Sequence, residues 1–152
     1  MSALKERLRA DLTAAMKARD ELTTATLRMA LAAVRTEEVA GPSARELSDN
    51  EVAAVLRREL KKRREATQAF TDAGRVESAD RERAEGVVLE AYLPAQLPDD
   101  ALVEVVRAAL AESGARDITE MGQAMRAAQA KVAGRADGAR VAAEVRRQLT
   151  AR

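Results

Sequence analysis

The feature that most constrains the fold of this chain is the near-absence of aromatic residues. Phe70 and Tyr92 are the only two among 152 residues, although 47% of the chain is hydrophobic. The core must therefore be built from Ala, Leu, Val and Met side chains. Strands draw on β-branched and aromatic residues, whereas Ala, Leu and Met favour helices. The composition predicts an all-α protein with an aliphatic core.

Apolar residues recur at helical spacing in the amino-terminal part. A leucine at every fourth position, at Leu4, Leu8 and Leu12, predicts a first amphipathic helix over residues 3–18. Asp20 is placed to cap a second helix, because its carboxylate can accept hydrogen bonds from free backbone N–H groups. Gly41 and Pro42 stop helices efficiently, so the second helix must end before them.

A long third helix begins at a capping box. In this motif the side chains of Ser48 and Glu51, three residues apart, each satisfy a free backbone N–H. The helix runs for about 25 residues before Gly74, which suits the left-handed conformation just beyond a helix end. Helices of this length usually project or pair, so we expect a fourth helix, over roughly residues 77–92, to fold back and form a long helical hairpin.

The string YLPAQLP marks the expected domain boundary, because its two prolines impose extended backbone and end helical character. We predict a helical amino-terminal domain over residues 1–93 and a proline-containing linker over residues 94–98. A small three-helix domain should follow over residues 99–152.

Apolar spacing in the last domain predicts three short helices. The first should end near Gly114 and the second at Gly134. Asp137 can cap the third helix, and Asp117 or Thr119 can cap the second. About 50 residues in three helices lie near the lower limit for independent folding.

Self-contained catalysis is not predicted. The chain has no cysteine and no histidine, which excludes thiolate nucleophiles, the usual zinc ligand sets and imidazole catalysis. It has no glycine-rich phosphate motif, and its serines lack an activating neighbour. The acidic pairs Glu37–Glu38 and Asp99–Asp100 diverge by about 100° on a helix. We therefore expect no catalytic residue, no metal and no cofactor.

The amino terminus mixes basic and acidic residues and lacks the apolar segment of a signal peptide. The longest apolar run, residues 29–34, is too short to span a bilayer. We expect a cytoplasmic protein that has no membrane partner.

Charge is unevenly distributed along the chain. The net charge is only +1, yet residues 116–152 contain eight basic and four acidic residues. This pattern favours a localised basic surface over a strongly basic coat. In the third predicted helix, Arg57, Lys61 and Arg64 fall on one face and could follow a row of phosphates. The alternative is a solvated face whose cations pair with nearby acids.

The last domain supplies a second set of candidate phosphate contacts. They are Arg126, Lys131, Arg135 and Arg140. In the string GRADG, helix ends account for the glycines and the aspartate, but they leave Arg135 unexplained. Exposed amides together with Arg135 could meet an anion at a helix start. Gly122 lies inside a predicted helix, where close packing explains it better than a ligand.

Seven strings, in their order and spacing, resemble the GatB/YqeY family over residues 1–150, and the stand-alone YqeY-like proteins in particular. Pro98 is a departure, since relatives tend to carry a capping serine there. The strings are AMKARD (15–20), LRM (27–29), RELKKRRE (58–65), AGR (73–75), YLPAQL (92–97), MGQAM (121–125) and GRADG (134–138).

The resemblance implies a helical domain followed by a three-helix tail similar to the end of the B subunit of the tRNA-dependent amidotransferase. In that enzyme the tail is associated with gripping tRNA. The family label it implies is carbon–nitrogen ligase with glutamine as amido donor. The B subunit of that enzyme has a kinase-like cradle with metal ligands, where the acyl group is phosphorylated, and its partner subunit has a Ser/Lys amidase site. Neither is recognisable in this sequence.

The function predicted from the sequence is an accessory module without catalysis of its own. It would bind tRNA or a tRNA-handling protein complex through the basic residues named above. One alternative is a protein-interaction module whose aliphatic tail docks a partner helix. Another is an amidotransferase component that other subunits complete.

Overall fold

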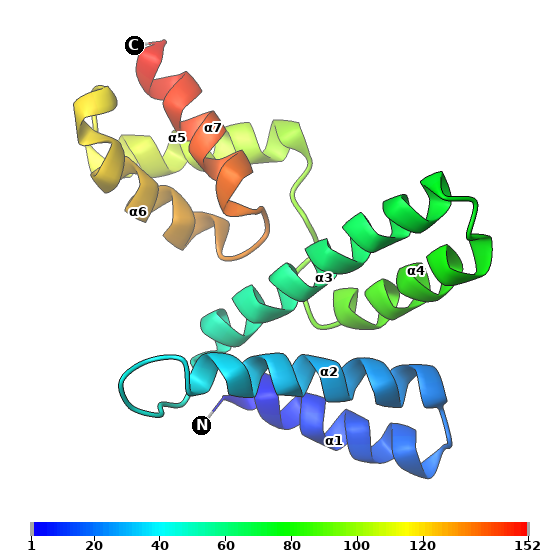
Figure 1. Cartoon of the computed structure of the whole chain (residues 1–152). Coiled ribbons are helices and arrows are strands. Elements are labelled where there is room, and N and C mark those ends of the chain that lie inside the picture. Colours follow the sequence, from blue (N-terminus) through cyan, green and yellow to red (C-terminus); the bar gives the residue numbers. More distant parts are fainter. Residues whose placement is uncertain (1, 152) are drawn as a thin grey trace. The chain divides into compact units, whose positions relative to one another are not determined.

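The structure is a computed structural model that describes residues 2–151. Within this range it contains seven α-helices, one 3₁₀ helix and no strand, which confirms the all-α prediction (Figure 1). By its internal contacts the chain divides into two compact units, Met1–Leu93 and Pro94–Arg152. Among the described residues, no helix is both long and apolar enough to cross a membrane.

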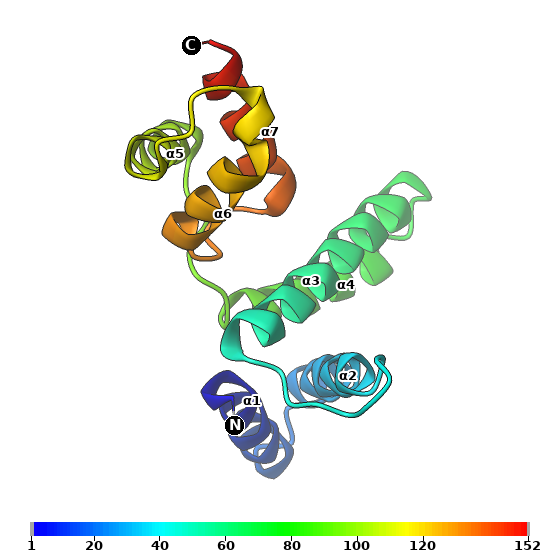
Figure 2. The same ribbon diagram turned by 90° about the vertical axis from the view of Figure 1, so that its left-hand side faces the viewer.

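The first unit consists of two helical hairpins. The longer hairpin pairs α3 with α4, which run side by side in both views (Figures 1 and 2), and α2 contacts both of them. The helices of this unit are α1 (Ala3–Lys17), α2 (Glu21–Glu38), α3 (Asp49–Asp72) and α4 (Val76–Glu90).

Side-chain caps begin the first three helices. Asp20 caps α2 by accepting a hydrogen bond from the Thr23 N–H at 3.1 Å. The predicted capping box of Ser48 and Glu51 is present at the start of α3. Beyond α3, Gly74 has a φ of 73°, the left-handed value that favours glycine. The positions predicted to begin and end these helices are thereby confirmed.

The core of each unit is aliphatic, as the composition predicts. Every buried hydrophobic side chain among the described residues is Ala, Val or Leu. The half-buried Tyr92 instead packs at the edge of the first core, where its hydroxyl donates to Asp11 at 2.5 Å and the Arg7 guanidinium lies 4.6 Å from its ring centroid. The first core includes Leu8, Leu27, Val34, Val52, Leu56, Leu60 and Leu89.

The second unit is a three-helix bundle in which each long helix contacts the other two. Its helices surround the buried residues Leu102, Val106, Leu110, Ala124, Ala128, Val141 and Val145. Its elements are α5 (Asp99–Ser113), the 3₁₀ helix η1 (Ile118–Glu120), α6 (Met121–Val132) and α7 (Gly138–Thr150).

Two helix starts in this unit differ in detail from the sequence expectation. Asp117 accepts a hydrogen bond from the Thr119 N–H and so caps η1, which leads into α6. Pro98 occupies the cap position of α5 and makes no side-chain hydrogen bond there. The Asp100 carboxylate instead accepts from the Ala101 N–H at 2.9 Å. An acidic first turn therefore stabilises α5 without a capping side chain.

Candidate nucleic-acid interface

The basic stretch of α3 is not uniformly exposed, because Arg63 turns into the protein. Its side chain lies in the first unit's interior, and the Arg63 residue is only 5% exposed. Its Nε lies 3.3 Å from a carboxylate oxygen of Glu85 on α4, and Nη1 lies 3.8 Å from Glu59. Nη2 donates to the sulfur of Met29 on α2 at 3.4 Å. Arg63 therefore connects three helices and is not a surface contact.

Three neighbouring cations on α3 form ion pairs with acidic residues. Both side chains are exposed in the pairs of Arg58 and Arg64, whereas the partner of Lys62 is only 14% exposed. Exposed pairs contribute only about 0–1 kcal/mol, so a phosphate can replace the acid at low cost. The pairs are Arg58 with Glu37 at 3.1 Å, Lys62 with Glu59 at 3.2 Å, and Arg64 with Glu90 at 3.3 Å.

The predicted stripe of Arg57, Lys61 and Arg64 contains one cation that no acid neutralises. Lys61 is exposed, and no acidic residue in the described part of the chain pairs with it. Arg57 is half-buried and interacts elsewhere within the chain. Contact with phosphates by this stripe stays a prediction, and Lys61 is its most accessible member.

The structure gives a structural role to Arg135. Its Nε donates to the Val132 carbonyl and its Nη2 to the Lys131 carbonyl, both at 2.9 Å. These carbonyls belong to the last turn of α6, whose acceptors have no partner within the helix. The guanidinium thus caps the carboxyl end of α6. Its backbone carbonyl also accepts the Leu97 N–H at 2.7 Å.

Two further tail candidates have partners within the second unit. Nη2 of Arg140 donates to the Leu97 carbonyl at 2.8 Å and to Asp99 at 2.9 Å, which ties the start of α7 to the segment before α5. Lys131 pairs with Glu112 of α5 at 2.5 Å. Both cations therefore already form contacts between different segments of the second unit.

The tail also presents arginines that have no such task. Arg126 on α6 and Arg146 on α7 are exposed, and within residues 2–151 neither forms an ion pair. Arg147 differs, because it forms an ion pair with Glu144 at 2.7 Å. That hydrogen bond lowers the pKa of the Glu144 carboxyl. Arg146 is not among the phosphate contacts predicted from the sequence, and only the structure distinguishes it from its paired neighbour Arg147.

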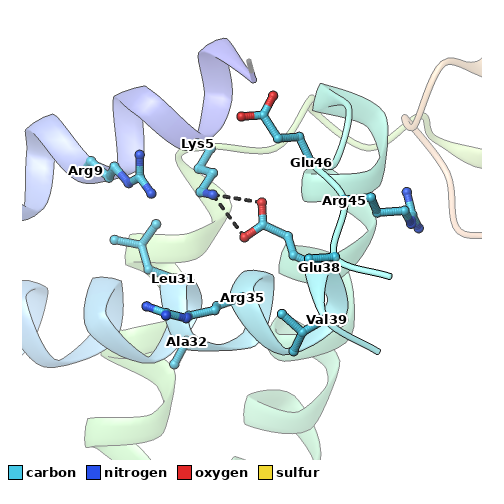
Figure 3. A pocket seen from close by; sticks show the side chains of 10 residues that line it. Lys5, Arg9, Leu31, Ala32, Arg35, Glu38, Val39, Arg45 and Glu46 are labelled. Atoms are coloured by element: carbon cyan, nitrogen blue, oxygen red, sulfur yellow. Dashed lines mark hydrogen bonds and ion pairs between the residues drawn. The ribbon is translucent and has the colours of Figure 1, made fainter. Parts of the chain in front are cut away.

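The first unit contains a pocket that the sequence does not predict. It has a volume of about 690 Å³ and lies between α1, the end of α2 and the loop that follows α2 (Figure 3). Lys5, Arg9, Arg35 and Arg45 line it together with the acids Glu38 and Glu46. No motif signals this pocket, because its residues come from three separate segments.

Within residues 2–151, no three His, Cys, Asp or Glu side chains gather closely enough to hold a metal ion.

The fold and these surfaces define a class: an all-α protein of two helical units, with exposed cations in the second. A sequence model of the family described as Yqey-like protein matches residues 5–149. The chain belongs to this family, which confirms the resemblance inferred from the motifs. None of the curated proteins compared with the chain matches it.

Proposed function

We propose that this protein is an accessory module that binds tRNA, or a tRNA-handling complex, and performs no catalysis of its own. The observation that carries the proposal is the exposure of Arg126 and Arg146, neither of them paired with an acid in the described chain. They lie in a segment, residues 116–152, in which basic residues outnumber acidic ones by eight to four. Unpaired arginines on a net-positive surface suit phosphate contacts.

The α3 stripe supplies further candidate contacts in the first unit. Lys61 is unpaired there, and the exposed pair of Arg64 with Glu90 can exchange its acid for a phosphate. Aromatic residues are too scarce for stacking on unpaired bases. The proposed mode of binding is therefore contact with the phosphates of a folded RNA, which makes affinity steeply dependent on salt. A preference for tRNA would then come from its shape and not from its bases.

The alternative, a protein-interaction module that docks a partner through its tail, has less support. Docking of that kind requires an exposed apolar surface. Of the large hydrophobic side chains exposed in the described chain, Ile118 is the only one in the second unit. Apolar docking would also tolerate salt, so the same titration separates the two functions.

The test is tRNA binding by the purified protein at two salt concentrations, with an unrelated structured RNA as competitor. We expect salt-sensitive binding that the competitor does not displace. The double charge reversal Arg126→Glu/Arg146→Glu should weaken binding by about tenfold or more and reduce the salt dependence. Arg83→Glu, which reverses an exposed arginine of α4, is the single-site control. No binding at low salt would eliminate the tRNA module.

The ligase label of the family leads to a different experiment. A complex in which other subunits supply the catalytic machinery would transfer ammonia to a misacylated tRNA when this chain is added. An unchanged transfer rate with and without the chain would remove support for that role.

A further inference from the structure

We propose that the pocket between α1, α2 and the loop after α2 binds a small organic anion. Arg9 and Arg35 would hold the oxyanion, a phosphate or a carboxylate, and an aliphatic body would lie over Leu31 and Val39. This site goes beyond RNA binding and does not depend on it, because the tail cations are not part of the pocket.

Helical spacing brings the pocket residues to one place. Lys5 and Arg9 are four residues apart and share a face of α1. Leu31 and Arg35 are likewise four apart on α2, and Glu38 follows three residues later. The two faces meet at a pocket of about 690 Å³, a size typical of sites for small molecules.

An internal ion pair forms a fixed wall of this pocket. Lys5 Nζ lies 2.8 Å from Glu38, and their side chains are only 16% and 13% exposed. Figure 3 shows the ammonium group pointing at both carboxylate oxygens. Because the two charges neutralise each other, the remaining charges of the lining are those of the arginines and of Glu46, which interacts with another group.

Arg35 is a cation of the pocket that forms no ion pair with the described residues. It is exposed, and in the described part of the chain no carboxylate pairs with it. Arg9 pairs with Glu6 at 2.9 Å, but both side chains are about half exposed, so this pair is weak and exchangeable. In Figure 3 both arginines lie on one side of the Lys5–Glu38 pair. A planar guanidinium on each helix suits the bidentate binding of an oxyanion.

The other residues that line the pocket indicate which kind of chemical group the bound anion carries. Leu31 is half-buried and lies near Arg9 and Arg35 in Figure 3, whereas Val39 is 58% exposed and lies on the other side of the pocket. Both present aliphatic surface to a ligand. None of the lining residues is aromatic, so the pocket offers no stacking partner for a nucleobase. Arg45 is occupied by Glu51 at 2.7 Å and lies on the other side of the ion pair (Figure 3).

The experiment titrates three probes into the isotope-labelled full-length protein and follows amide chemical shifts. Hexyl phosphate and hexanoate carry the two oxyanions on one aliphatic body, and hexanol carries the body alone. We expect at least one anion to bind with saturating shifts confined to α1, α2 and the loop, and hexanol not to bind. The anion that binds more tightly identifies the oxyanion.

Two matched variants test the role of the arginines. Arg35→Gln should weaken anion binding at least about fivefold, since it removes a charge-assisted contact. Arg28→Gln removes an exposed cation from the same helix, outside the pocket, and should leave affinity unchanged within twofold. Three results would overturn the proposal: no anion binding at millimolar concentration, equal binding of hexanol, or equal losses in the two variants.

Discussion

In the first unit Arg63 enters the core between α3 and α4, whereas in the second unit Arg135 stays near the surface and donates to backbone carbonyls. The two arginines are held by different interactions, a buried ion pair in the first case and hydrogen bonds to backbone carbonyls in the second. Arg63 faces Glu85, and both residues are more than nine-tenths buried. Removal of one partner would leave a charge in a medium of low dielectric. Loss of Arg135 leaves only carbonyls at a helix end, which water can reach. The first unit should therefore be more sensitive to the loss of one arginine.

The largest effect is expected for Arg63→Ala. Among the described residues, the variant leaves the buried Glu85 with only the exposed Arg81 as an ion-pair partner, at 3.1 Å. We predict a loss of about 3 kcal/mol in the free energy of unfolding. Urea titration followed by fluorescence of Tyr92, the only tyrosine, reports on the first unit.

The double variant Arg63→Met/Glu85→Leu separates the loss of charge balance from the loss of packing. Both charges are removed and the volume is roughly retained, so most of the stability should return. If the double variant were as unstable as Arg63→Ala, the cost would lie in packing. The contrast with Arg135 would then lose its electrostatic basis.

A smaller effect is predicted for Arg135→Ala. The substitution removes two hydrogen bonds that cap α6, which should cost about 1–2 kcal/mol. Hydrogen exchange at the last turn of α6 measures the loss locally. Arg146→Ala, which removes an arginine without a described partner, is the control and should leave exchange unchanged. Equal acceleration of exchange in both variants would show that Arg135 is not a cap.

The roles of these two arginines differ in how far they could be predicted. Leu56, Leu60 and Arg63 share one face of α3, so helical spacing places Arg63 on the buried side. The identity of Glu85 as its partner depends on how α3 and α4 pack, which spacing does not specify. Arg135, in contrast, binds carbonyls three and four residues back, a local pattern that basic residues near helix ends adopt.

Element types and most caps followed from local rules. The capping box of Ser48 and Glu51 involves neighbours in sequence, and so does Asp137, which accepts the Arg140 N–H. The pocket could not be predicted, because α1, α2 and a loop meet there only after folding. Whether Arg126 forms an ion pair likewise depends on which carboxylates the folded bundle brings close to it.

The contrast between units extends to their carboxylates and predicts a pH dependence. Asp49 at the start of α3 accepts hydrogen bonds from the Ser2 hydroxyl and from the Leu4 N–H, and thereby ties α3 to α1. These bonds, the Ser2 bond foremost, lower the pKa of the Asp49 carboxyl. A lowered pKa in the folded state gives stability that is complete above the unfolded pKa of about 4 and is lost as pH falls through the folded pKa.

Asp49→Asn should therefore lower stability at pH 7, and the difference from the original protein should close as the pH falls below about 4. Urea titrations at pH 7, 4 and 3 measure this difference. Asp117→Asn is the matched variant in the second unit, where hydrogen bonds from Thr119, within the same turn, lower the pKa. Its effect should stay local to η1. A pH-independent difference for Asp49→Asn would exclude the linkage.

The smallest effect on stability is expected for Arg126→Ala and Arg146→Ala. Both side chains are exposed and make no described ion pair, so each substitution should change the free energy of unfolding by less than about 0.5 kcal/mol. If they contact RNA, the same variants should weaken tRNA binding at low salt. Arg135→Ala should do the reverse and lower stability more than affinity. A loss of stability at Arg126 equal to that at Arg135 would show that Arg126 has a structural role, and it would remove Arg126 from the proposed RNA contacts.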